Sequence, residues 1–303
     1  MTELSQKILD KFQVRKNKKQ KLHFIAFLKK YFPDLQVQEG GFPKSRNIIL
    51  GDVEQAKVVL SAHYDTCAQL PFPNLITPKN ILLSILYSLL IVLPFLVLGM
   101  VLYYLALRFS ENIYVGYSIA IIFYFLILFL AFSGPANKHT ANDNTSGVIT
   151  LCEIYQAMTP EQRARTAVVF FDNEELGLIG SSYFNSAYRK TMKNKLLINF
   201  DCVSDGDNIM IAVNKNARPQ YWDLFTKCYS PVDEKHVLIE RAERLLYPSD
   251  QANFKCTAAV AALRKKKFIG YYMSRIHTSK DTVFDEKNIE LLKDCTISFI
   301  DSI

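Results

Sequence analysis

Acidic and histidine residues follow several short apolar runs of the kind that form buried strands. The runs and the polar residues after them are Val58–Ser61 with His63 and Asp65, Val168–Phe171 with Glu174 and Glu175, Leu196–Phe200 with Asp201, and Tyr271–Met273 with His277. The carboxyl ends of parallel strands meet at one edge of a sheet, where ligands bind. We therefore expect these side chains to converge there, together with Asp143 from the segment 141–147.

The residue types in this set indicate metal binding. Carboxylates crowded at one edge could not all ionise unless a cation lay among them. Imidazole and carboxylate ligands without a thiolate suit zinc or a similar divalent ion, and a carboxylate-rich set can hold two ions that share a bridging group. A lone histidine or aspartate at a strand end is more often structural, so the joint pattern is what favours a metal centre.

Five short motifs resemble those of the co-catalytic zinc aminopeptidases, the family of the bacterial leucyl aminopeptidases with carboxypeptidase and glutaminyl cyclase relatives. In chain order they are His63-Tyr64-Asp65-Thr66, Asn142-Asp143-Asn144-Thr145-Ser146-Gly147, Phe171-Asp172-Asn173-Glu174-Glu175-Leu176-Gly177 with Gly180-Ser181, Asn199-Phe200-Asp201, and Ile276-His277-Thr278 with Asp281-Thr282. They occur in the order that the family has. The resemblance implies a zinc-exopeptidase-like fold and the hydrolysis of peptides.

The resemblance also implies which residues hold the metal. His63 and Asp201 would bind one zinc ion, Glu175 and His277 the other, and Asp143 would bridge the two. Two zinc ions are thus the expected cofactor, and other divalent metals fit the same kinds of ligand. Water between two such ions has a lowered pKa, and the ions polarise the carbonyl of the bond to be cleaved.

Three further residues receive roles from the resemblance. Glu174 would be the general base that takes the proton of the attacking water and passes it to the leaving amine. Its neighbour Glu175 can still bind metal, because adjacent residues leaving a strand point in different directions. Asp65 would orient His63 through the second ring nitrogen. Tyr247 lies near the place where some family members have a tyrosine that stabilises the oxyanion, although the local match is loose.

Strands and helices alternate along the polar parts of the chain, which predicts an α/β fold with a mixed, mostly parallel central sheet and helices on both faces. Residues 47–50 and 58–61 predict a hairpin around the Gly51-Asp52 turn, followed by a core strand. Further strands are expected at 166–171, 196–200, 209–213 and 258–263, and helices at 146–158, 219–229, 250–256 and 286–302.

A strongly apolar insert interrupts this pattern. Of the 57 residues from 81 to 137, 43 are hydrophobic, and only Arg108 and Glu111 are charged. The uncharged runs Ile81–Leu107 and Ile113–Asn137 each exceed the roughly 20 residues that a helix needs to cross a bilayer. We expect a two-helix transmembrane hairpin with both flanks on one side, and the insert separates His63 from Asp143.

The charge distribution predicts how the chain is organised. Residues 1–32 carry nine Lys or Arg against two acidic residues, which equals the whole net charge of +7. We expect three parts: a basic amphipathic helical arm at 1–33, a discontinuous metallopeptidase catalytic domain at 34–80 and 138–303, and the hairpin at 81–137. A neutral remainder argues against nucleic-acid binding, whereas a basic arm suits either solvent or an anionic leaflet.

Charge and cysteine content also predict the compartment. Lys79 and Lys138 flank the insert, so the positive-inside rule places the catalytic domain on the cytoplasmic side of a multi-pass, two-span protein. The six cysteines are far apart and form no CxxC motif, which favours reduced thiols. The expected partners are a peptide substrate and the lipid bilayer, and the oligomeric state stays open.

The function predicted from the sequence is therefore that of a membrane-anchored di-zinc exopeptidase, in the first place an aminopeptidase. A glutaminyl cyclase-like acyltransferase and a non-catalytic receptor-like module are alternatives, and a transporter is disfavoured because the two spans offer no charged path for an ion. Residue preference, and the choice between aminopeptidase, dipeptidase and carboxypeptidase, stay open. The hairpin either tethers the enzyme or shapes access for substrates held partly in the bilayer.

Overall fold

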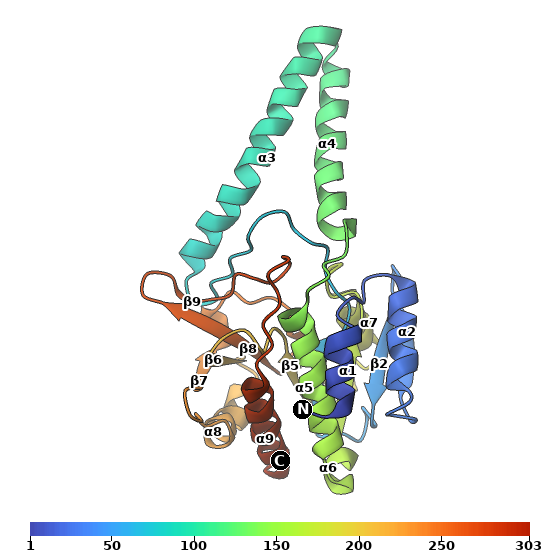
Figure 1. Cartoon of the computed structure of the whole chain (residues 1–303), viewed down its shortest axis with the longest axis vertical. Coiled ribbons are helices and arrows are strands. Elements are labelled where there is room, and N and C mark those ends of the chain that lie inside the picture. The colour runs from blue at the N-terminus through green and yellow to red at the C-terminus, as the bar shows by residue number, and fades with distance from the viewer.

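The computed structural model describes residues 1–303, and its centre is a nine-stranded mixed sheet (Figure 1). The strands are β1 (Gln36–Gly40), β2 (Ser45–Leu50), β3 (Val58–His63), β4 (Thr166–Phe171), β5 (Leu196–Phe200), β6 (Asn208–Val213), β7 (His236–Arg241), β8 (Thr257–Lys266) and β9 (Gly270–Tyr272). Their order is β1-β2-β4-β3-β5-β8-β6-β7, with β9 paired to β8. The central strands β4, β3, β5 and β8 are parallel, which confirms the predicted fold class.

Helices cover both faces of this sheet. They are α1 (Glu3–Lys11), α2 (Lys18–Leu28), α5 (Gly147–Ala157), α6 (Pro160–Ala164), α7 (Ile179–Ala187), α8 (Arg218–Cys228) and α9 (Glu286–Asp301). Successive side chains of β3 point to opposite faces of the sheet. Val58 and Leu60 pack into a large core with α1, α2, α5, α8 and α9. Val59 points the other way, into a smaller core that contains Phe184 of α7.

The sequence prediction of a hairpin at 47–50 and 58–61 is wrong. β2 pairs with β1 on one side and with β4 on the other, so β4 lies between β2 and β3. The connection after Gly51 is too long for a tight turn, and it buries Val53 and Ala56 in the smaller core. This arrangement lets β3 and β4 run parallel and end at the same edge.

Other elements differ in length. The helix expected at 250–256 is only the short 3-10 turn Asp250–Asn253, and β8 extends three residues beyond the predicted end at 263. The strands β1 and β7 were not predicted, because they lie at the two ends of the sheet order and carry partly exposed, polar residues. Edge strands lack the continuous apolar run that marks a buried strand.

The N-terminal basic segment packs on the large core through both of its helices. Leu4 and Ile8 of α1 and Phe24 of α2 are buried there. Glu153 of α5 holds the first turn of α1, since its carboxylate accepts hydrogen bonds from the Thr2 amide at 2.7 Å and from the hydroxyl of Ser5 at 2.6 Å. The apolar faces of these helices are thus internal, whereas the division of the chain into three parts stays a prediction.

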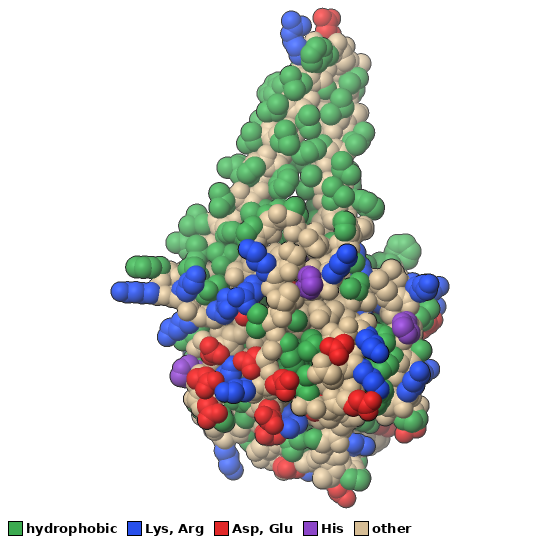
Figure 2. Space-filling model, in the orientation of Figure 1, with side chains coloured by type: hydrophobic (Ala, Val, Ile, Leu, Met, Phe, Trp, Pro, Cys, Tyr) green, Lys and Arg blue, Asp and Glu red, His purple; other side chains and the backbone are tan.

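The insert forms two long helices, α3 (Ile81–Ser110) and α4 (Ile113–Ser133), which project from the body, meet at their far end and diverge towards the sheet (Figure 1). Both are long and apolar enough to cross a membrane, and of their most apolar stretches 0% and 6% is buried. Figure 2 shows their hydrophobic side chains on the outside. Gly99 permits close approach, since a Cβ there would lie 2.2 Å from the Tyr124 hydroxyl oxygen.

Candidate metal centre

The predicted ligands lie at one edge of the sheet, as the strand directions require. His63 is the last residue of β3, and Asp201 directly follows β5. Glu175 lies in the turn after β4, and His277 lies in the loop after β9. Asp143 comes from the turn Ala141–Ser146 that leads into α5. Five segments that are distant in sequence thus bring one predicted ligand each to the same place.

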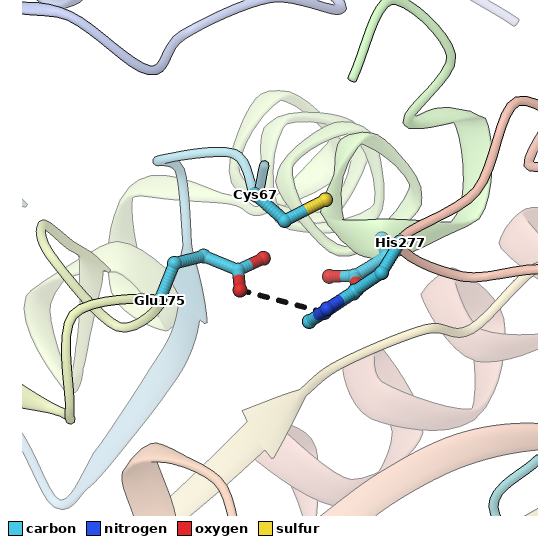
Figure 3. A group of neighbouring side chains, drawn as sticks. Cys67, Glu175 and His277 are labelled. Carbon is cyan, nitrogen blue, oxygen red and sulfur yellow. Dashed lines mark ion pairs between the residues drawn. The ribbon is translucent and has the colours of Figure 1, made fainter. Parts of the chain in front are cut away.

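The geometry divides these ligands into two groups that share Asp143. In the first group, His63 Nε2 lies 3.3 Å from Asp143 Oδ1 and 3.5 Å from Asp201 Oδ1. In the second, His277 Nε2 lies 3.0 Å from Asp143 Oδ2 and 3.4 Å from Glu175 Oε2. Figure 3 shows Glu175 and His277 pointing toward one another. Each oxygen of Asp143 therefore faces a different histidine, which is the geometry of a bridging carboxylate.

Two buried oxygen atoms show that the donor set fits cations. Glu175 Oε1 and Asp201 Oδ1 are buried and accept no hydrogen bond. Burial raises the pKa of Glu175 to about 8, and His277 lowers it only in part. Burial works against protonation of His277, yet Glu175 and Asp143 raise the pKa of this imidazole to about 10. Without metal the cluster thus retains protons, and cations would compete for the same positions.

Glu174 lies beside the two groups. One of its oxygens is within 4.8 Å of ligand atoms of His63 and Glu175, but it belongs to neither group that contains Asp143. Burial raises its pKa well above the usual value, and neighbouring Glu175 raises it further against the effect of His63. A carboxylate that adjoins the metal positions without filling one can exchange a proton there.

Asp65 contacts the glutamates more directly than it contacts His63. Its carboxylate oxygens accept hydrogen bonds from the backbone N–H of Glu174 at 3.0 Å and from that of Glu175 at 3.3 Å. His63 Nδ1 lies 3.2 Å from the Asp65 backbone oxygen and 3.7 Å from its carboxylate. The side chain of Asp65 therefore fixes the turn that carries both glutamates, while its backbone faces the imidazole.

The turn around Asp143 is fixed in a similar way. Asp281 accepts hydrogen bonds from the backbone N–H of Asn142 at 2.8 Å and of Asp143 at 3.0 Å. The Asn142 side chain accepts from the backbone of Ser204 at 2.8 Å, beyond Asp201. The bridging position is thus bound to two of the other ligand segments through short polar contacts.

Tyr247 lies at the site, but its hydroxyl group is engaged. The hydroxyl donates a hydrogen bond to the Asp201 backbone oxygen at 3.0 Å. It would have to release this contact in order to donate to an oxyanion. Its role in catalysis stays a prediction.

Two residues at the site were not predicted from the sequence. Cys67 Sγ is close to ligand atoms of Asp143, Glu175 and His277 (Figure 3). Burial raises the pKa of this thiol well above its usual value. Asp250 is fully buried with neither oxygen hydrogen-bonded, and burial raises its pKa to about 7. In the sequence, only the short spacing from His63 could have suggested Cys67. Only the position of Asp250 shortly after Tyr247 could have suggested that residue.

Two cations of the basic segment were also missed. Lys21 Nζ lies 2.5 Å from the buried carboxylate of Asp172, directly before the glutamate turn. The guanidinium of Arg15 is fully buried and donates to the backbone oxygen of Tyr64 at 2.5 Å, next to His63. A lysine-rich run usually indicates a solvated face, so its sequence gave no signal that two members are internal.

Comparisons with known proteins agree with this geometry. The sequence model of peptidase family M28 matches residues 128–299, more than half of the chain. The chain belongs to peptidase family M28. The match contains the segments of Asp143, Glu175, Asp201 and His277, and His63 lies before it. The sequence-based resemblance and the classification as a metallopeptidase are thereby confirmed, and membership implies peptide substrates.

Solved structures with a similar fold include those of three bacterial proteins. The LapA aminopeptidase of Legionella pneumophila has 13% identity and a TM-score of 0.56, and the match covers 98% of this chain and 69% of LapA. A Zn-dependent exopeptidase of Parabacteroides distasonis has 14% identity and a TM-score of 0.59, with coverage of 98% and 94%. Glutaminyl cyclase of Porphyromonas gingivalis has 14% identity and a TM-score of 0.57, with coverage of 99% and 96%. No curated protein sequence matches the chain.

These likenesses establish a shared fold. They include a peptidase and a cyclase at nearly equal similarity, so the fold alone does not select between these two reactions.

Asp65→Asn should separate turn geometry from metal binding. The amide keeps the size of the side chain but faces at least one backbone N–H with a donor, at a cost of about 1–3 kcal/mol. We expect kcat to fall about 10- to 100-fold with the zinc content unchanged, as measured by peptide kinetics and elemental analysis. Exposed Asp223→Asn is the matched control. Unchanged kcat, or loss of zinc, would contradict this role for Asp65.

Proposed function

We propose that the chain is a membrane-anchored aminopeptidase that uses two zinc ions. The observation that carries this proposal is the sharing of Asp143 between two histidine-carboxylate groups, each with a buried oxygen that lacks a partner. His63 and Asp201 would hold one ion, Glu175 and His277 the other, with Asp143 between them. When bound, the ions would lower the pKa of the attacking water and polarise the scissile carbonyl.

The residues of the chain supply the proton transfers. Glu174 takes the proton of the attacking water and then donates it to the leaving amine. Burial raises the pKa of Glu174, so this carboxyl group can hold the proton that it takes from the water until the amine leaves. The Asp65 carboxylate holds the turn that carries Glu174 and Glu175 in place, because it accepts hydrogen bonds from the backbone N–H groups of both residues. The substrate would bind with its scissile peptide bond beside the proposed metal centre at the edge of the sheet.

Glu174→Gln tests the general base. The amide keeps the shape of the side chain and cannot take a proton, so kcat should fall about a hundred- to ten-thousandfold. The variant should still bind two zinc ions, because Glu174 lies outside both groups that share Asp143. Kinetics on aminoacyl substrates with elemental analysis measure both, and exposed Glu290→Gln is the control. A fully active variant would reject this assignment.

The same assay separates the aminopeptidase from its alternatives. A zinc-loaded chain that releases N-terminal residues is a peptidase, whereas one that only cyclises N-terminal glutamine is a cyclase. A chain that binds zinc and does neither is a receptor-like module. The filled ligand positions favour an enzyme over the last of these.

The apolar helix pair supports the membrane anchor. Exposed apolar surface on α3 and α4 would be costly in water, and burial in hydrocarbon removes that cost. Lys79 and Lys138 lie at the two feet of the pair, which supports a cytoplasmic catalytic domain. A cysteine introduced at Ser110 should therefore react with an impermeant thiol reagent added outside intact cells. Labelling only after permeabilisation would place Ser110 in the cytoplasm and contradict the proposed orientation.

We also propose that the hairpin shapes substrate access. A cavity of about 370 Å³ lies between Tyr87 and Ile91 of α3, the loop residue Phe72, and Leu246 and Pro248. The last two flank Tyr247, whose hydroxyl reaches the backbone of a proposed ligand. An apolar cavity shared by a membrane helix and a loop of the site suits an apolar part of a substrate.

Replacing residues 81–137 by a short Gly-Ser loop should therefore raise KM for peptides with apolar N-terminal residues, because one wall of that cavity is lost. Peptides with small polar residues serve as the comparison, and the intact chain in detergent is the control. Equal kinetics of both chains on all peptides would show that the hairpin only tethers the enzyme.

A further inference from the structure

The β8–β9 hairpin extends beyond the edge of the sheet that carries the proposed metal centre. β5 ends at Phe200, which pairs with Val260 of β8. β8 continues for six residues to Lys266, about 20 Å at the usual rise of a strand. The chain then turns through 267–269 and returns as β9, with Lys266 paired to Gly270. The turn therefore stands well beyond the strand ends that hold the ligands.

The same hairpin is attached to the foot of α3. Ile76, five residues before the start of α3, exchanges two backbone hydrogen bonds of 2.9 Å with Met273, just after β9. Lys79 lies over the ring of Tyr271 at 5.1 Å. Figure 1 shows β9 beside the beginning of α3. The position of the turn relative to the proposed membrane span is thus fixed by the fold.

The turn carries a cationic and aromatic surface, which we call the hairpin tip and define as Lys265–Phe268. Phe268 is 90% exposed, among the most exposed large apolar side chains of the body. Lys265, Lys266 and Lys267 are exposed, and none of them has a carboxylate within 4.0 Å. Figure 2 shows Lys and Arg side chains along the body just below the apolar helices.

We propose that the hairpin tip docks on the headgroup layer of the leaflet that α3 enters, with Phe268 inserted and the three lysines bound to anionic phospholipid. Lysines that lack a carboxylate partner and lie beside a membrane span attract anionic lipid, and an aromatic ring suits the interface. This contact lies to one side of the helix pair, so it limits the tilt of the body. The proposed metal centre is then held towards the membrane surface. The inference rests on the membrane anchor of the proposed function, not on the reaction.

A single-tryptophan experiment tests the docking in the full chain. The protein has one tryptophan, Trp222 of α8, so Phe268→Trp in a Trp222→Phe background places the only indole at the tip. The variant is reconstituted in vesicles that contain phosphatidylserine and lipid brominated near the ester end of its acyl chains. We expect blue-shifted emission, quenching by the brominated lipid and protection from aqueous acrylamide.

Two comparisons make the result specific. Lys265→Gln, Lys266→Gln and Lys267→Gln together should abolish most of the quenching, and so should vesicles of phosphatidylcholine alone. Removal of three charges on the opposite side, in Arg189→Gln, Lys190→Gln and Lys193→Gln, should leave it unchanged. The unaltered chain should show no quenching of Trp222, because α8 follows the end of β6 at the opposite edge.

Several outcomes would overturn the docking. An indole at position 268 that is fully open to acrylamide and not quenched by brominated lipid excludes it, as does quenching that the lysine substitutions leave unchanged. Release of the chain from vesicles by alkaline washing would overturn both the anchor and the docking. Peptide hydrolysis, measured in the same vesicles, distinguishes failure of the docking from failure of the proposed function. An active enzyme whose indole is not quenched would contradict the docking alone.

Discussion

The rest of the structure depends on the electrostatics of one shared carboxylate. Asp143 is buried between His63 and His277, and the carboxyl groups of Asp201, Glu174 and Glu175 adjoin the same small volume. Such a set is costly in a protein interior unless positive charge balances it. Against the effect of burial, Glu175 and Asp143 raise the pKa of His277, and burial raises the pKa of Glu175, which favours protons in this cluster when no metal is bound. Metal ions would supply the same positive charge.

Holding that cluster in place accounts for much of the surrounding polar structure. Asp65 and Asp281 each accept two backbone hydrogen bonds, from the glutamate turn and from the Asp143 turn respectively. Lys21 pairs with Asp172 immediately before the glutamate turn. All the predicted ligands except His63 come from turns and loops, and these contacts give the loops the rigidity that catalytic geometry needs. The basic segment therefore contributes to the site as well as to the core.

The helix pair leaves the fold between two residues of the same cluster. A hairpin returns the chain to its starting side, so an insert of this size is compatible with an intact site, as the positions of His63 and Asp143 show. The loops that frame the insert also frame the site. Under the proposed membrane anchor, access to the cluster is expected to depend on how the body lies against the membrane, which a terminal anchor would not control.

Sequence patterns by themselves determined the parts whose signal is local. Continuous apolar runs identified the buried strands β4 and β5, whose bounds agree with the prediction, and the residues after those strands include the predicted ligands Glu175 and Asp201. Length and composition identified α3 and α4. Tertiary structure alone decided the pairing of β2, the edge strands β1 and β7, and the contact of Asp65 with the glutamate turn. Tertiary structure also decided that Lys21 and Arg15 are buried. The physical reason is that ion pairs and strand pairing depend on residues far apart in the chain, which a local sequence pattern does not reveal.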